Sequence, residues 1–162
     1  MANETVKRIG AGGWWRVIDE QPDPTVEKQI TLYSCVAAVG VMLLRTNGIS
    51  VTQQSVIDII GESSTIEELG RFLNSCEPIG ERESWHGIIV DDNDLLTIAA
   101  HQRFGAVFRE GRPLGHMVLV VGLNKDMLKI NDLWDGTTYW MTIEEFRRVW
   151  NGDVVLQWKL SR

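Results

Sequence analysis

Hydrophobic residues in the first half of the chain are spaced as in helices. Residues 35–44 form an uncharged run long enough for one buried helix, and Ser34 stands directly before it in the place of an N-cap. Two capping boxes precede the next two hydrophobic runs: Ser50 with Gln53, and Thr65 with Glu68. We therefore predict three helices in this half, with Cys35 at the start of the first.

The second half has the short hydrophobic runs and turn residues of antiparallel strands, which follow a polar connection over 77–84. A helix begins at Asn93 or Asp94, and Thr142 caps another short helix. Strands are expected at 85–90, 106–108, 116–122, 127–132, 138–141 and, after an Asn-Gly turn at 151–152, at 154–158. Helices first and sheet second predict one α+β domain, in which an N-terminal helical lobe packs against a C-terminal antiparallel sheet.

Residues 1–27 are expected to form a loop-like arm, and the domain is assigned to 28–162. Glycines at 10, 12 and 13 invite a dinucleotide-binding interpretation. We reject it because no clear strand precedes them, and Trp14 and Trp15 follow where a helix should begin. The aromatic pair is expected to dock onto the domain or onto a partner.

The hairpin of 116–122 and 127–132 decides whether His116 and Asp132 meet. With a three-residue loop at 124–126, the numbers of two residues that face each other across the hairpin add up to 250, so Val118 lies opposite Asp132. His116 is two residues from Val118 along the strand and therefore on the same face. A two-residue loop would put Asp132 on the opposite face. We predict the three-residue loop, which makes the imidazole a base held in one tautomer by a carboxylate.

The sequence supplies the three residue types of a nucleophile, a base and an orienting group in Cys35, His116 and Asp132. A thiol at a helix N-terminus is biased toward the thiolate by the helix dipole. The thiolate would attack an acyl carbon while His116 carries the proton and Asp132 orients the ring. The backbone N–H of Cys35 and the side-chain amide of Gln29, six residues upstream, could bind the resulting oxyanion.

Other candidates have simpler explanations. Asp135 is a rival to Asp132, but its place before Gly136 suggests a turn-capping role. His86 and His101 are expected at a strand edge and a helix end, where solvated roles suffice, and Cys76 has no evident partner.

Composition excludes several classes of function. The chain has 162 residues, a formal charge of −6 and two cysteines. Scattered basic residues argue against nucleic acid as a partner, and the cysteine spacing supports neither a disulfide framework nor a metal site. No apolar run is long enough for membrane insertion, and the start of the chain lacks a signal sequence. We expect a soluble cytoplasmic domain without cofactors, or one that is delivered by a route without a signal peptide.

The order Gln29, Cys35, His116, Asp132 resembles that of the papain-like cysteine peptidases. The segments 34–38, 115–122, 130–136 and 141–146 are more specifically similar to bacteriocin-processing peptidase domains that cleave double-glycine leaders, and to papain-fold toxin and effector domains of bacteria. The resemblance covers about 28–158. It departs at Val36, where those leader peptidases usually have Gly, and at Leu133, where they usually have Pro.

This resemblance implies a papain-like fold and a cysteine peptidase with Cys35 as nucleophile, His116 as base, Asp132 as orienting residue and Gln29 as oxyanion residue. The expected substrate is a protein or peptide, and an inhibitor or immunity protein is a further candidate partner. Two alternatives stay open: the same triad could deamidate or acylate a target protein, or the chain could be an inactive protein-binding module. The absence of a transporter segment after the domain disfavours a role as the peptidase arm of an exporter.

Overall fold

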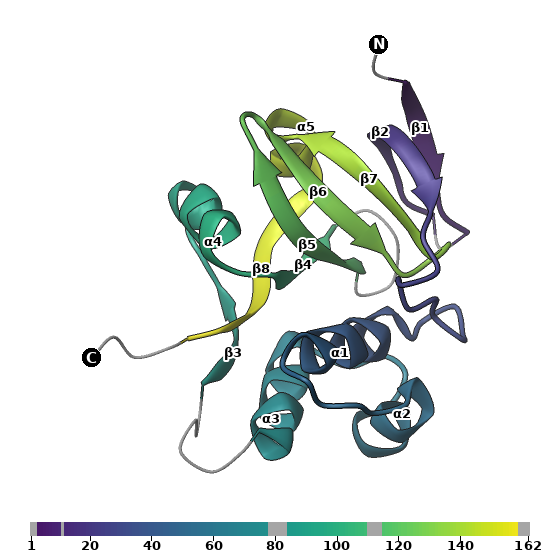
Figure 1. Ribbon diagram of the computed structural model, residues 1–162, viewed down its shortest axis with the longest axis vertical. Coiled ribbons are helices and arrows are strands. Elements are labelled where there is room, and N and C mark those ends of the chain that lie inside the picture. Colours follow the sequence, from purple (N-terminus) through teal and green to yellow (C-terminus); the bar gives the residue numbers. More distant parts are fainter. Residues whose placement is uncertain (1–2, 11, 78–83, 110–114, 159–162) are drawn as a thin grey trace.

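Three helices lie together on one side of a twisted antiparallel sheet (Figure 1). The computed structural model describes residues 3–10, 12–77, 84–109 and 115–158. The three helices, here called the helical lobe, are α1 (Cys35–Thr46), α2 (Gln53–Ile60) and α3 (Ile66–Cys76). This arrangement confirms the predicted α+β architecture, in which the helix that starts with Cys35 packs against the sheet.

The sheet has the strand order β1-β2-β7-β6-β5-β4-β8-β3 within the described residues, with antiparallel pairing throughout. Two short helices, α4 (Leu95–His101) and α5 (Ile143–Val149), and a 3-10 turn at Asp92–Asp94 complete the fold. The strands are β1 (Glu4–Arg8), β2 (Trp14–Pro22), β3 (Trp85–Ile89), β4 (Phe104–Phe108), β5 (His116–Asn124), β6 (Met127–Asp132), β7 (Thr137–Thr142) and β8 (Trp150–Gln157). The polar connection predicted over 77–84 lies, apart from its two end residues, outside the described residues.

The sheet separates two hydrophobic cores. Met117 and Leu119 of β5 pack into the core shared with the helical lobe, whereas Val118 and Val120 pack into the core on the other side. This alternation follows from the two-residue period of a strand. It places His116 on the same face as Val118, at the edge of the second core.

Helix α1 is buried along its first ten residues. Gly40 permits its close approach to α3, because a Cβ there would lie 2.9 Å from Leu69 Cδ1. Ser34 is at the N-cap position, but its hydroxyl donates to Gln53 Oε1 (2.7 Å) and makes no side-chain capping bond. The helix therefore starts at Cys35 as predicted, but Ser34 serves to join α1 to α2.

The capping box of Thr65 and Glu68 is confirmed at the start of α3. The one predicted for Ser50 and Gln53 is wrong, because α2 starts at Gln53 and is capped by Thr52, whose hydroxyl accepts from the Ser55 N–H. The Gln53 side chain is buried under the segment that leads to α1, so it is not available for a capping box.

The prediction of a loop-like arm is wrong for the two N-terminal strands. β1 and β2 form a hairpin, and β2 joins the main sheet by pairing with β7. Trp15 and Val17 are fully buried, while Trp14 and Arg16 between them are exposed. This short alternation is the signature of a half-buried strand, and the neighbouring glycines and prolines obscured it.

The hairpin of β5 and β6 has the predicted register at the site but not the predicted turn. The turn has two residues, Lys125 and Asp126, and Lys125 adopts the left-handed conformation (φ 57°) typical of such turns. A bulge between Val120 and Gly122 then shifts the pairing by one residue, so that Leu119 faces Asn131. The bulge compensates for the shorter turn and keeps His116 and Asp132 on one face.

The last strand also starts earlier than predicted. β8 begins at Trp150 and contains the Asn-Gly pair at 151–152, with Gly152 in the left-handed conformation (φ 94°). An irregularity in the pairing of β4 with β8 accommodates this segment. The predicted turn residues therefore mark a distortion within a strand and not its start.

Candidate active site

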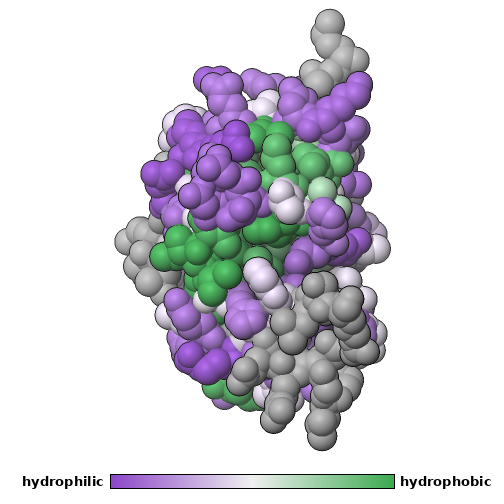
Figure 2. All heavy atoms as spheres, turned by 90° about the vertical axis from the view of Figure 1, so that its left-hand side faces the viewer, coloured by the Kyte–Doolittle hydropathy of each residue, from purple (hydrophilic) through white to green (hydrophobic). Residues whose placement is uncertain are grey.

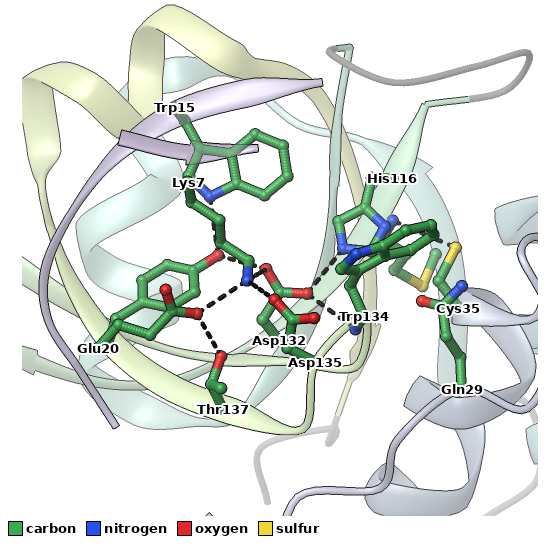
Figure 3. A network of polar contacts seen from close by, with 12 residues as sticks. Lys7, Trp15, Glu20, Gln29, Cys35, His116, Asp132, Trp134, Asp135 and Thr137 are labelled. Atoms are coloured by element: carbon green, nitrogen blue, oxygen red, sulfur yellow. Dashed lines mark hydrogen bonds and ion pairs between the residues drawn. The ribbon is translucent and has the colours of Figure 1, made fainter. Parts of the chain in front are cut away.

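Cys35 lies where the helical lobe meets β5 (Figure 3). It is the first residue of α1, and only 8% of its surface is exposed. The backbone N–H of Met117, the second residue of β5, donates to its sulfur at 3.5 Å. The thiol is therefore fixed beside the strand that carries His116.

His116 and Asp132 form a buried hydrogen-bonded pair. His116 is the first residue of β5 and Asp132 the last of β6, and Nε2 of the ring lies 2.8 Å from Oδ1 of the carboxylate. Because Nε2 is used in this bond, Nδ1 is the ring nitrogen left for Cys35. The structure thus brings together three residues that are far apart in sequence and were expected to act together.

Both oxygens of Asp132 are held by further donors. The backbone N–H of Trp134 donates to Oδ1 (3.0 Å), and the Tyr139 hydroxyl donates to Oδ2 (2.7 Å). The indole N–H of Trp15 in turn donates to the Tyr139 hydroxyl (2.8 Å). A carboxylate with this many donors stays ionised and keeps one orientation.

Two tryptophan rings enclose the imidazole (Figure 3). Trp15 stacks on His116 with ring centroids 5.6 Å apart and an angle of 22° between the planes. Trp134 meets the same ring edge-on, at 6.4 Å and 85°. These contacts limit rotation of the imidazole and keep water away from its bond to Asp132.

The pKa values within the site move in the directions that favour an ion pair. Burial lowers the pKa of His116, but the charge of Asp132, its hydrogen bond and the neighbouring Cys35 outweigh burial and raise this pKa to about 10. Burial raises the pKa of Asp132, but His116, Lys7 and Tyr139 together lower it to about 2. The pKa of Cys35 is lowered despite burial, because His116 and the Met117 N–H stabilise the thiolate. A thiolate next to an imidazolium is therefore the favoured state near neutral pH.

Gln29 lies in the segment just before α1, close to Cys35 (Figure 3). Its backbone N–H donates to the carbonyl of Leu133 (2.7 Å), which ties the segment to the residue after Asp132. Its side-chain Nε2 donates to the carbonyls of Thr31 (2.9 Å) and Leu32 (3.1 Å). Its Oε1 is buried and accepts no hydrogen bond within the described part of the chain. The amide is thus near the thiol, but both of its N–H groups are occupied.

The rival candidates lie away from the thiol. Asp135 pairs with Lys7 and does not contact His116. His101 ends α4, where its ring is exposed and hydrogen-bonded to the carbonyl of Thr97, and His86 lies in the edge strand β3. Cys76 is a half-buried free thiol at the end of α3.

Three residues around the Asp132 carboxylate were not anticipated from the sequence as parts of the site: Lys7, Trp15 and Tyr139. The alternation of Tyr139 with Met141 in β7 was a signal that could have placed the tyrosine inside. Lys7 had no such signal, because it is buried while its apolar neighbour Val6 is exposed.

A cleft of about 250 Å³ opens beside Cys35 and His116. Leu32, Val36 and Ile89 are among its lining residues. Figure 2 looks onto the side that carries α4 and β3 and shows hydrophobic residues exposed among polar ones. Ile89, the last residue of β3, is 76% exposed, so the cleft rim is continuous with exposed apolar surface. Such a rim suits the apolar side chains of an extended peptide.

None of the helices described by the structure is long and apolar enough to cross a membrane. Among residues 3–10, 12–77, 84–109 and 115–158, no three His, Cys, Asp or Glu side chains are grouped so that they could hold a metal ion.

Comparisons with known proteins agree with the fold and with the sequence resemblance. No protein-family model matches the chain. The chain is 40% identical over 149 residues, or 90% of its length, to cysteine protease effector 1 of Escherichia coli, of which it spans only 29%.

Two solved structures share the fold. The peptidase domain of Streptococcus ComA, a bifunctional ABC transporter involved in quorum sensing, aligns with a TM-score of 0.65 and 18% identity over 82% of this chain and 97% of that domain. A double-glycine-motif protease from an AMS/PCAT transporter, solved in complex with its leader peptide, aligns with a TM-score of 0.66 and 18% identity over 91% of this chain and 94% of that one. The resemblance predicted from the sequence is therefore confirmed: the chain has the papain-like fold of the double-glycine peptidase domains and is a homologue of one segment of a bacterial cysteine protease effector.

Proposed function

We propose that this chain is a cysteine peptidase that hydrolyses a peptide bond through a thioacyl intermediate on Cys35. The observation that carries the proposal is the position of the Cys35 thiol beside a buried imidazole, whose other nitrogen is 2.8 Å from the Asp132 carboxylate. Each part has a role in acyl transfer, and the fold shared with the double-glycine peptidase domains supports the assignment.

In the proposed reaction, Nδ1 of His116 holds the proton of the Cys35 thiol before substrate binds, and the thiolate attacks the carbonyl carbon of the substrate. The C–N bond breaks as the imidazolium gives its proton to the leaving amine, which leaves a thioester on Cys35. Water then attacks the thioester while His116 takes its proton, and the carboxylic acid and the free thiol are released. Asp132 keeps the ring in place throughout.

The oxyanion formed in each attack needs hydrogen-bond donors. The backbone N–H of Cys35 is one, because the first N–H groups of a helix have no acceptor within the helix. We assign the second to the Gln29 amide, which must exchange the carbonyl of Thr31 or Leu32 for the oxyanion when substrate binds. Donors of this kind contribute roughly 3 kcal/mol each to lowering the barrier.

The substrate class is a protein or peptide. This is supported by the cleft beside Cys35, which has both apolar and polar lining residues, by the leader peptide bound to one structural neighbour and by the name of the E. coli relative. The word effector in that name favours a bacterial effector or toxin over a housekeeping enzyme. An inhibitor or immunity protein that occupies the same cleft remains a prediction.

Thiol labelling at pH 6–7 tests the proposal. Cys35 should react with a neutral alkylating reagent much faster than Cys76, and the reaction should disappear in Cys35→Ala and slow in His116→Ala, with His101→Ala as the matched control. Equal labelling of the two thiols would contradict an activated nucleophile. A gain of about one dalton on a target protein without cleavage would instead identify deamidation, which uses the same acyl chemistry on a side-chain amide.

A further inference from the structure

Lys7 brings a buried positive charge to the back of the His116–Asp132 pair. It lies in β1, and only 2% of its side chain is exposed. Its ammonium group is 2.8 Å from Glu20, 2.5 Å from Asp135 and 4.0 Å from Oδ2 of Asp132 (Figure 3). The motifs that carry the sequence resemblance start at Gln29, so none of them includes Lys7.

The same N-terminal hairpin contacts the pair in a second way. Trp15 of β2 stacks on the His116 ring, and its N–H holds the Tyr139 hydroxyl that donates to Asp132. The Lys7 ammonium also lies over the Tyr139 ring, 5.8 Å from its centroid. The hairpin of β1 and β2 therefore acts on both members of the pair.

We infer that Lys7 is a positioning residue of the proposed peptidase: its ammonium group shares the Asp132 carboxylate with His116, and so sets how tightly the site holds its protons. The inference rests on the proposed function, because it assigns Lys7 a role in that peptidase site. Its effect can still be measured without a substrate, on the titration of the Cys35 thiol. Oδ1 of Asp132 faces His116 while Oδ2 faces Lys7, so the carboxylate lies between two cations.

The sign of the effect follows from the charges around the site. His116 faces the thiol of Cys35 from α1 and the carboxylate of Asp132 from β6. Behind that carboxylate lie the Tyr139 hydroxyl and the Lys7 ammonium group, and Lys7 is paired with Glu20 and Asp135. A nearby cation favours deprotonation of every group it faces, because it repels imidazolium and stabilises thiolate. Lys7→Met removes this cation and leaves the carboxylates of Glu20 and Asp135 without it, so both the thiol and the imidazole should titrate at higher pH. Glu20→Gln removes a negative charge and should move both in the opposite direction.

The test is the pH dependence of Cys35 alkylation by iodoacetamide, in a Cys76→Ser background so that one thiol remains. Lys7→Met should raise the midpoint of thiolate formation by roughly 0.5–1 pH unit, and Glu20→Gln should lower it, as expected for charges acting at an effective dielectric constant of about 20. Lys7→Arg keeps the positive charge, so this variant should have the same alkylation midpoint as the wild type. Lys125→Met, which removes an exposed lysine in the turn between β5 and β6, is the matched control and should leave it unchanged.

The opposite signs separate the inference from simple damage to the fold, because a loosened site would shift both variants in the same direction. A shift of Glu20→Gln in the same direction as Lys7→Met, or an unshifted midpoint in a folded Lys7→Met variant, would overturn the inference. If Lys7→Met does not fold, the Glu20→Gln shift decides alone. A wild-type midpoint at the ordinary value for cysteine would instead refute the proposed function, so the two failures can be told apart.

Discussion

Asp132→Asn removes the charge that holds the proton on His116 while keeping almost the same side-chain shape. The Asn oxygen should take the place of Oδ1, which accepts from His116 Nε2 and the Trp134 N–H. Its amide nitrogen then faces the Tyr139 hydroxyl, which must give up its donation, and Lys7. The ring should therefore stay oriented while its electrostatic support is lost.

The expected size of the effect follows from the pKa of His116. The site raises it from the ordinary 6.5 to about 10, and Asp132 is the main cause. Without the carboxylate this pKa should fall, and removing one partner of a buried ion pair costs about 3–5 kcal/mol. Burial then keeps the imidazole neutral at pH 7, so the thiolate loses its counterion. We expect alkylation of Cys35 at pH 7 to slow at least about tenfold, and peptide cleavage to slow by roughly 10²–10⁴.

The assay is a mass-spectrometric time course of iodoacetamide addition between pH 4 and 10, with Cys76→Ser as the background. Asp58→Asn, an exposed carboxylate on α2, is the matched control and should behave as wild type. A folded Asp132→Asn variant with the wild-type alkylation profile would refute the conclusion that the His116–Asp132 pair creates the thiolate.

Three further predictions follow from the contacts around the site. Gln29→Ala should lower kcat for peptide cleavage by about 10²–10³-fold and leave the pH midpoint of Cys35 alkylation unchanged, because alkylation forms no oxyanion. A shifted midpoint together with the lower kcat would point to a structural role. Gln53→Leu removes bonds to the Ile30 N–H (2.9 Å) and the Ser34 hydroxyl (2.7 Å), so the free energy of unfolding in urea should fall by about 1–3 kcal/mol, and an unchanged value would contradict a supporting role. Asp132 ionises more readily in the folded protein, so its contribution to the free energy of unfolding is present above its ordinary pKa of 3.8 and is lost as pH falls toward about 2. The urea midpoint should therefore fall less on acidification in Asp132→Asn than in wild type. An equal fall of the midpoint in both proteins would assign the acid effect to other carboxylates.

The hairpin illustrates how far the sequence predicts the site. Alternation along β5 and β6 predicted that His116 and Asp132 share a face, and they do. The turn was predicted one residue too long, and the bulge between Val120 and Gly122 was not foreseen. A bulge is one extra residue in an otherwise regular strand, and hydrophobic alternation in a fully apolar run such as 117–121 cannot reveal where it lies.

The N-terminal hairpin illustrates what the sequence did not predict. Its strands are short and lie beside glycines and prolines, so local pattern favoured a loop over a strand. Burial of Lys7 depends on Glu20 and Asp135, and the second of these is 128 residues away in the chain. Such a charge cluster is a consequence of the tertiary fold and has no local signal.

The central claim is that Cys35 cleaves peptide bonds, and an unbiased search for new protein N-termini tests it most directly. Bacterial lysate is incubated with the wild-type chain or with Cys35→Ala, and the N-termini that arise are compared by mass spectrometry. We predict a set of new N-termini that requires wild-type protein and shares a common sequence around the cleaved bond. No difference between wild type and Cys35→Ala, in a preparation whose Cys35 is shown to be reactive, would contradict the claim.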